Sequence, residues 1–273
     1  MAHKHLVGIS SYSYPYACKG FPGSSVFSAE DLIDKAEELG VGCVQYGDNM
    51  PLEHLDDEQL AGLRRRAGSK GIVIEAGMRH ASAERLTRYI HIAELLGAHL
   101  LRVIIDDREG AFEPDADQVL TIINDALPLL EEKGIILGIE NHDRFTVDEY
   151  AALVKKAGSR YVGMVVDTTN SLSTEESCEN VLEKLGPYCV CLHIKDYRIS
   201  RIPGGLGLMI TGACLGEGRM DAKTAVETAG KLSDRDFNVI LESWMQPCET
   251  MEETLKQEAA WAAAGVEELK KLV

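Results

Sequence analysis

The sequence has no CxxC pair, and its seven cysteines are scattered at positions 18, 43, 178, 189, 191, 214 and 248. This scatter and the odd number do not fit a zinc ribbon or the paired cysteines of a disulfide-stapled secreted domain. Cys189 and Cys191 alternate along an apolar run, where a thiol packs as a small hydrophobic group. We therefore expect a cytoplasmic protein without disulfides.

Long hydrophobic runs are also absent. No apolar stretch approaches the roughly 20 residues that a membrane-spanning helix needs. The first ten residues, MAHKHLVGIS, lack the apolar centre and the cleavage pattern of a signal peptide. The sequence thus predicts neither a membrane protein nor a secreted one.

Positive charge is scarce, with 28 Lys and Arg against 44 Asp and Glu and a net charge of -16. The one dense basic run, Arg64–Arg66, lies in a helical pattern and is explained by a solvated helix face. Nucleic acids and anionic membranes bind to clustered Lys and Arg, so we expect neither as a partner. A small molecule is the expected partner.

Eight short apolar runs alternate with helical patterns along the chain. The runs occupy residues 6–11, 42–47, 71–77, 99–106, 136–141, 161–167, 189–195 and 238–244. Such buried, non-alternating strands are typical of an all-parallel sheet covered by helices. Eight strand–helix units in this length predict an α/β fold with a single (β/α)8 TIM barrel over residues 1–273.

The structural alternative is an open, doubly wound sheet. That fold usually carries a glycine-rich GxGxxG turn after its first strand. Here the first run leads into SSYSYPYACKGFPG, which has no such turn. The closed barrel is therefore the prediction, with one unusually long loop at about 197–220 after the seventh strand.

Metal-ligand side chains stand at the carboxyl ends of the last four predicted strands. They are Glu140, Asp167, His193 and Glu242. Barrel enzymes place their catalytic residues at this end, and adjacent strands are about 4.8 Å apart, so four side chains at one height can converge. Three carboxylates so close would repel one another unless a cation lies between them. The set predicts one divalent metal ion, Mn²⁺ first, with Mg²⁺, Co²⁺ or Zn²⁺ as alternatives.

Each of these residues also has a structural explanation. A single Asp or Glu at a strand end usually caps a helix or begins a loop, and a single His there is as often structural as functional. The same position in four consecutive units is what favours a metal site.

The pieces that carry these residues are GIEN, VVDTTN, LHIKD and ILES, and GEGRMD at 216–221 is a further match. Through them the whole chain resembles the xylose isomerase-like TIM-barrel family. That family includes sugar phosphate isomerases and epimerases, ketose 3-epimerases, inosose dehydratases and endonuclease IV-type enzymes. The resemblance implies a metal-dependent enzyme of carbohydrate metabolism.

In the 3-epimerase branch the resemblance implies that Glu140 and Glu242 are catalytic as well as metal-binding. They would exchange a proton on opposite faces of a sugar whose enediolate the metal stabilises. The chain departs from that branch at Asn170, where the family often has His. The Asn, the acidic charge and the lack of His on the second strand disfavour the DNA-repair branch.

Six further residues are predicted to bind substrate. His142 and Lys195 each lie two residues beyond a metal ligand, and Trp244 follows Glu242 in the same way. The remaining three are Asn170, Arg198 and Arg201. Each could instead be an ordinary loop or core residue. The loop at 197–220 is expected either to close over the site or to pack on a second subunit of a homo-oligomer.

The sequence therefore predicts a metal-dependent isomerase or epimerase of a small sugar, keto-sugar or sugar acid. The alternative on the same site is a lyase, a decarboxylase or dehydratase of a sugar-derived keto acid or keto-inositol. A third hypothesis is a binding protein whose metal site has decayed, and the presence of all four ligands argues against it.

Overall fold

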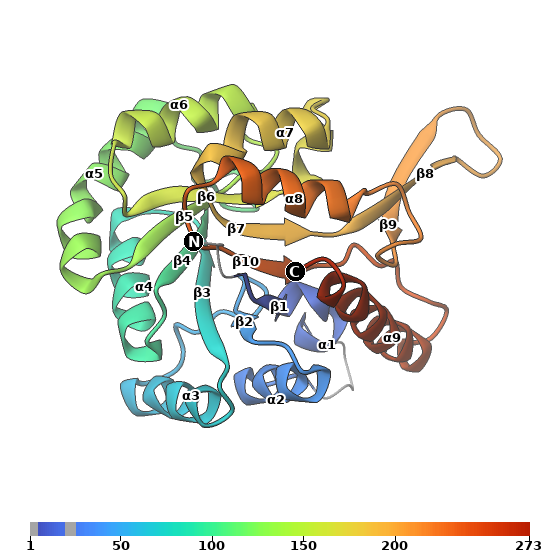
Figure 1. The fold of residues 1–273 in the computed structure, drawn as a ribbon, viewed down its shortest axis with the longest axis horizontal. Coiled ribbons are helices and arrows are strands. Elements are labelled where there is room, and N and C mark those ends of the chain that lie inside the picture. The colour runs from blue at the N-terminus through green and yellow to red at the C-terminus, as the bar shows by residue number, and fades with distance from the viewer. Residues whose placement is uncertain (1–4, 20–25) are drawn as a thin grey trace.

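Eight parallel strands close into a barrel in the computed structural model, which describes residues 5–19 and 26–273 (Figure 1). The strands follow one another around the barrel in the order β1-β10-β7-β6-β5-β4-β3-β2. Their bounds are β1 Val7–Ser10, β2 Cys43–Gln45, β3 Val73–Arg79, β4 Leu100–Ile104, β5 Ile136–Glu140, β6 Val162–Asp167, β7 Cys189–Ile194 and β10 Asn238–Leu241. Seven of the predicted runs contain one of these strands, and the eighth, 71–77, covers all of β3 except its last two residues. The closed sheet excludes the doubly wound alternative.

Helices surround the barrel (Figure 1). They are α1 Pro15–Lys19, α2 Ala29–Leu39, α3 Asp57–Ser69, α4 Ala83–Leu96, α5 Ala116–Lys133, α6 Val147–Ala157, α7 Cys178–Leu185, α8 Ala222–Leu232 and α9 Met251–Lys270. Short 3-10 turns occupy Ser11–Ser13, Asn170–Thr174 and Gly186–Tyr188. None of the helices within the described ranges is long and apolar enough to cross a membrane.

The helix ends follow from local chemistry. Thr146 caps α6 by accepting from the N–H of Glu149, whose side chain in turn binds the Thr146 N–H. This reciprocal arrangement satisfies two backbone donors that have no partner inside the helix. On α3 the basic run is solvated as expected: Arg65 pairs with Glu58 at 2.5 Å, and Arg66 pairs with Asp34 at 2.5 Å.

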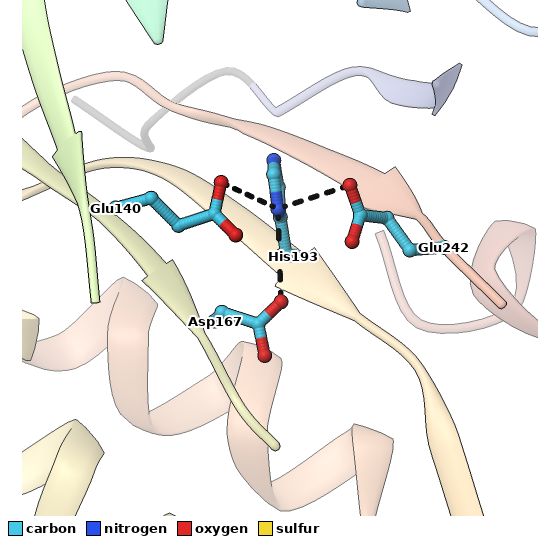
Figure 2. Close-up of side chains that lie close together, drawn as sticks. All are labelled: Glu140, Asp167, His193 and Glu242. Atoms are coloured by element: carbon cyan, nitrogen blue, oxygen red, sulfur yellow. Dashed lines mark ion pairs between the residues drawn. The ribbon is translucent and has the colours of Figure 1, made fainter. Parts of the chain in front are cut away.

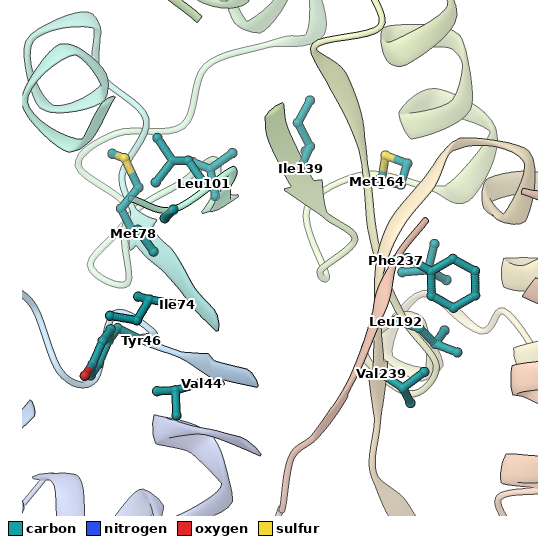
Figure 3. Close-up of a cluster of buried hydrophobic side chains, with 14 of the residues drawn as sticks. Val44, Tyr46, Ile74, Met78, Leu101, Ile139, Met164, Leu192, Phe237 and Val239 are labelled. Carbon is teal, nitrogen blue, oxygen red and sulfur yellow. The ribbon is translucent and has the colours of Figure 1, made fainter. Parts of the chain in front are cut away.

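The main core lies between the strands and the helices, where apolar side chains from neighbouring strands pack in one layer (Figure 3). A smaller apolar cluster includes Cys43, Val165, Cys191 and Ile240, which come from four different barrel strands. Cys189 and Cys191 are both fully buried and free, as their alternation predicted. Packing on both faces explains why the barrel strands read as continuous apolar runs.

The segment 197–220, predicted as a long loop, instead contains an antiparallel hairpin. Its strands are β8 (Asp196–Arg201) and β9 (Leu208–Ala213), and they form their own two-stranded sheet outside the barrel. The ribbon projects away from the barrel beyond α8 (Figure 1). The glycines of IPGGLG form the turn between two β-prone segments, so the glycine content that suggested an irregular loop marks a hairpin tip. Lys195 alone separates β7 from β8.

Asp196 fastens the base of this hairpin. The carboxylate accepts hydrogen bonds from the backbone N–H groups of Gly216 at 3.0 Å, Gly218 at 2.8 Å and Met220 at 2.8 Å. The side chain is 2% exposed. The loop GEGRMD is thus wrapped around one carboxylate, which satisfies three backbone donors at once.

We expect Asp196→Ala to lower the free energy of unfolding by roughly 3 kcal/mol, because three backbone N–H groups, one of them on the buried Met220, lose their charged acceptor. Asp196→Asn keeps one oxygen acceptor and should lose roughly half as much. Urea unfolding followed by circular dichroism measures both values. An Ala variant as stable as the wild type would show that the loop is held by other contacts.

Candidate metal centre

The four predicted ligands gather at the carboxyl ends of adjacent strands. Glu140, Asp167 and His193 lie on β5, β6 and β7, and Glu242 follows the last residue of β10. Asp167 is level with His193, whereas Glu140 is level with Val165, two residues earlier on β6. The ligands are therefore staggered in register along neighbouring strands. Because barrel strands tilt against the barrel axis, residues with such a register stagger can lie at similar heights and converge.

The ligand atoms are close enough to share one ion. One atom from each of the four side chains lies within 4.8 Å of the others. His193 Nδ1 lies 3.3 Å from Glu242 Oε1 and 3.7 Å from both Glu140 Oε2 and Asp167 Oδ2 (Figure 2). Ligand atoms that bind a metal at about 2.0–2.3 Å are separated by such distances. All four side chains are buried.

The imidazole of His193 is suited to bind a metal ion because its nitrogens are not used in any hydrogen bond within the described chain. Both ring nitrogens are buried without a hydrogen-bond partner within the described chain. Burial lowers the pKa of His193, but the charges of Glu242 and Glu140 raise it well above its ordinary value. In a buried site where three carboxylates converge, a bound proton or a cation must balance their charge. A divalent cation suits this set of three oxygens and one nitrogen.

The carboxylates are held by a second set of donors. Asp167 Oδ1 accepts from the N–H groups of Thr169 at 2.9 Å and Asn170 at 2.8 Å. Its Oδ2 lies 2.8 Å from Lys195 Nζ. Burial raises the pKa of Asp167, but the Lys195 charge outweighs this and holds it at about 2. Glu242 also pairs with Lys195, at 3.0 Å, and accepts from Ser10 Oγ at 3.3 Å.

Arg102 is the important residue that the sequence analysis left without a role. It lies on β4, is 2% exposed, and donates from Nε to Glu140 and from Nη1 to Asp48 at 3.0 Å. Burial raises the pKa of Glu140, but the charges of Arg102 and His193 keep it well below its ordinary value. Gly77 pairs with Arg102 on the next strand, and a Cβ there would collide with the backbone oxygen of Tyr46 and lie 3.1 Å from Arg102 Cδ. Glycine is therefore required by the neighbouring backbone, and it also leaves room for the Arg102 side chain.

Asn170 holds the other oxygen of Glu140. Its side-chain amide donates to Glu140 Oε1 at 2.9 Å. Where the family often has His, this chain thus has an Asn whose neutral amide holds the Glu140 carboxylate in place. With Arg102 on Oε2, both oxygens of Glu140 have a donor.

A cavity of about 290 Å³ opens directly above the cluster. Four of the six predicted substrate-binding residues line it: His142, Asn170, Lys195 and Trp244. Lys195 Nζ lies 4.9 Å from the centre of the Trp244 ring, a cation–π contact.

Three arginines also line this cavity, and the sequence analysis assigned none of them to it. They are Arg79, Arg102 and Arg108. Arg79 pairs with Asp106 at 2.8 Å, and Arg108 pairs with Asp48 at 2.9 Å. Burial raises the pKa of Asp48, but Arg102 and Arg108 together lower it to about 2. The one signal in the sequence was the charged Arg102 inside an apolar run.

Arg198 and Arg201 are not brought to the cavity. Both lie on β8, which leaves the barrel at Asp196, and both are exposed. Arg198 pairs with the exposed Glu217 at 3.1 Å. The expectation that the arginines after His193 contact substrate assumed a loop that returns over the barrel, and the hairpin takes them away from it.

Comparison with known proteins adds a family, a relative and a fold. A family model described as Xylose isomerase-like TIM barrel matches residues 33–272. A 3-oxo-isoapionate decarboxylase of Pectobacterium atrosepticum is 29% identical over 256 residues, covering 93% of this chain and 91% of that protein. The D-psicose 3-epimerase of Clostridium cellulolyticum H10, crystallised with D-tagatose, has a TM-score of 0.73 at 18% identity and covers 98% of this chain and 99% of its own.

A further solved structure is a xylose isomerase-like TIM barrel protein from Mycobacterium smegmatis in complex with magnesium. Its TM-score is 0.69 at 16% identity, with 97% of this chain and 99% of that chain covered. At such identities the two structures establish the shared fold. Together with the buried cluster, the family match indicates a metal-dependent enzyme.

We expect the purified protein to carry one divalent ion per chain, measured by inductively coupled plasma mass spectrometry. Removal of the ion with a chelator should lower the melting temperature by several degrees, because three buried carboxylates then face one another. Mn²⁺ should restore it. Asp167→Ala removes a ligand and should abolish the response to both treatments; a wild type that binds no metal and ignores the chelator would refute the site.

Proposed function

Because the chain belongs to the xylose isomerase-like TIM barrel family, we propose that it is a metal-dependent lyase that decarboxylates a small, sugar-derived β-keto acid. This is the lyase that the sequence offered as its alternative to an isomerase. The charge of the cavity favours it over the isomerase.

The cavity charge carries the proposal. Four permanent cations line the cavity: Arg79, Arg102, Arg108 and Lys195. Five carboxylates pair with them or form the cluster: Asp48, Asp106, Glu140, Asp167 and Glu242. A divalent ion changes this balance to one net positive charge around a largely buried site, in which only the Arg108 side chain, 54% exposed, faces solvent. A monoanionic substrate neutralises that charge, whereas a neutral ketose leaves it uncompensated.

The relative from Pectobacterium atrosepticum supports the same class. Its name describes an oxo acid that loses its carboxyl group. The likeness extends over 93% of this chain and 91% of that protein. The exact acid that this chain uses is not specified by that name.

Decarboxylation requires an electrophile for the carbonyl oxygen, donors for the carboxylate and hydroxyl groups, and a shielded space for the substrate. The bond between the carboxylate carbon and its neighbour breaks, CO₂ leaves, and the electron pair passes into the adjacent carbonyl as an enolate before the carbon takes a proton. A divalent ion in the cluster would supply the electrophile for the carbonyl oxygen. Lys195 and the arginines supply donors for the carboxylate and hydroxyl groups, and Trp244 covers one wall of the space and excludes water.

An epimerase of a ketose or sugar acid is the second candidate, and one observation favours it. Glu140 and Glu242 approach His193 from opposite sides, as two proton-exchanging groups would approach a sugar (Figure 2). It ranks second because neither glutamate has a free oxygen for proton exchange: Arg102 and Asn170 hold the two oxygens of Glu140, and Ser10 and Lys195 hold the two oxygens of Glu242.

A panel of substrates separates the two candidates. We expect the Mn²⁺-loaded protein to release labelled CO₂ from ¹³C-carboxyl β-keto sugar acids and, in D₂O, to place one deuterium in the product. Neutral ketoses should show neither turnover nor deuterium exchange. NMR reports both events, and epimerisation of a ketose without CO₂ release would replace the lyase with the second candidate.

We expect Glu242→Gln to lower kcat roughly 100-fold while the fold is retained, since the neutral amide replaces a charged metal ligand that also pairs with Lys195, and a loss of about 2.7 kcal/mol of transition-state stabilisation corresponds to that factor. Glu217→Gln, at an exposed carboxylate on the hairpin side, serves as the matched control and should keep full activity. Circular dichroism checks the fold of both. A Glu242→Gln enzyme with more than a tenth of wild-type turnover would contradict the assigned role.

A further inference from the structure

The β8–β9 hairpin concentrates the exposed hydrophobic surface of the molecule. Within the described residues, six of the ten exposed large hydrophobic side chains belong to it. They are Ile199, Ile202, Leu206, Leu208, Met209 and Ile210, and Leu206 at the tip is 98% exposed. Every residue from 198 to 210 is exposed. Soluble proteins rarely leave a contiguous patch of this kind without a partner.

The pairing of the two strands places three of these side chains, Ile199, Leu208 and Ile210, on one face. Ile199 pairs with Ile210, and Arg201 pairs with Leu208. Because side chains two residues apart share a face of a strand, these four residues form one surface, called here the apolar face. The opposite face carries Arg198 with Thr211 and Ser200 with Met209. The hairpin is therefore amphipathic, and within the described chain nothing covers the apolar face.

An isolated two-stranded hairpin is marginally stable in water. Within the described chain this one is fastened at its base, where Asp196 binds the following loop and Gly212 lies against the backbone of Trp244, and by the exposed ion pair of Arg198 with Glu217. The outer part gains no packing from the barrel, so its order depends on a surface that packs against it.

The charge of the hairpin indicates what kind of partner surface would pack against it. Residues 197–212 contain two arginines and no acidic residue, in a chain whose net charge is -16. Arg198 has its own partner in Glu217, but Arg201 on the apolar face forms no ion pair with any residue of the described chain. A basic, apolar projection complements an acidic surface, and another copy of this chain supplies one.

We propose that the hairpin is a dimerisation arm whose apolar face packs on a second copy of this chain. In a two-fold dimer each copy gives and receives the same surface, so the contact is made twice. The thirteen exposed residues from 198 to 210 amount to about half of the 20–30 residues that each partner gives to a standard interface. The neighbouring rim of the barrel contributes the rest.

The position of Ile210 ties this surface to the metal centre. Ile210 on the apolar face lines a hollow together with Trp244, Asn170 and His142, and the last three also line the cavity above the cluster. A partner seated on the apolar face therefore stands beside the entrance to the cavity. The segment 197–220 was expected either to cover the site or to contact a second subunit. In this dimer the hairpin would do both, because the subunit contact lies at the cavity entrance.

Sedimentation velocity and light scattering at micromolar concentration test the proposal. The wild type should be a dimer, and Leu208→Glu, which places a charge on the apolar face, should be a monomer with an unchanged circular dichroism spectrum. Ser200→Glu is the matched control on the opposite face and should remain a dimer.

Arg201→Glu is a second variant in case Leu208→Glu folds poorly, because the Arg201 side chain is exposed and its reversal disturbs no ion pair of the described chain. It should weaken the dimer at least tenfold. A monomeric wild type would overturn the proposal and leave the hairpin as a cover for its own site. Dimers that survive both substitutions would place the interface elsewhere and equally overturn it.

Discussion

Three carboxylates that meet in a dry barrel mouth are the constraint on which the rest of the site depends. Glu140, Asp167 and Glu242 cannot all carry a charge at these distances unless positive charge lies among them. Arg102 and Lys195 supply part of it from the protein, each from a buried position. The remainder can come from a proton on His193 or from a cation at the centre, next to an imidazole with no hydrogen-bond partner in the described chain. Folding thus assembles a site whose electrostatics favour a bound cation.

Epimerisation and decarboxylation can both use a metal centre of this kind. In our proposal the charge of the surrounding cavity distinguishes the two reactions. Relatives with the same barrel include proteins named as epimerases and one named as a decarboxylase. A metal held by three carboxylates and one His can polarise a carbonyl for either reaction, so the ligands alone do not select one. The selection falls to the cavity wall, where arginines from the first half of the barrel meet Lys195 from the second. Arg102 belongs to both the metal centre and the cavity wall, because it binds the metal ligand Glu140 and also lines the cavity.

The fold and the ligand set could be predicted from the sequence because the same pattern recurs in successive strand–helix units. Each barrel strand is an apolar run, and each of the last four ends in a ligand, so local pattern carries the information. Arg79 and Arg108 gave no such signal, since an arginine near a strand end is ordinarily a solvated residue. The stagger of Glu140 against Asp167 depends on strand tilt, which no single strand encodes. The hairpin was missed because IPGGLG resembles an irregular loop, and its strand pairing is decided by residues on either side of the turn.

The placement of Lys195 has a mechanical consequence. It is the single residue between the last residue of a barrel strand and the first residue of the hairpin, and its amine binds two of the metal ligands. A displacement of the hairpin root therefore moves the backbone that carries this amine. A partner that reorients the hairpin at its root would in this way change where the amine lies between Asp167 and Glu242, without any contact of its own with the site.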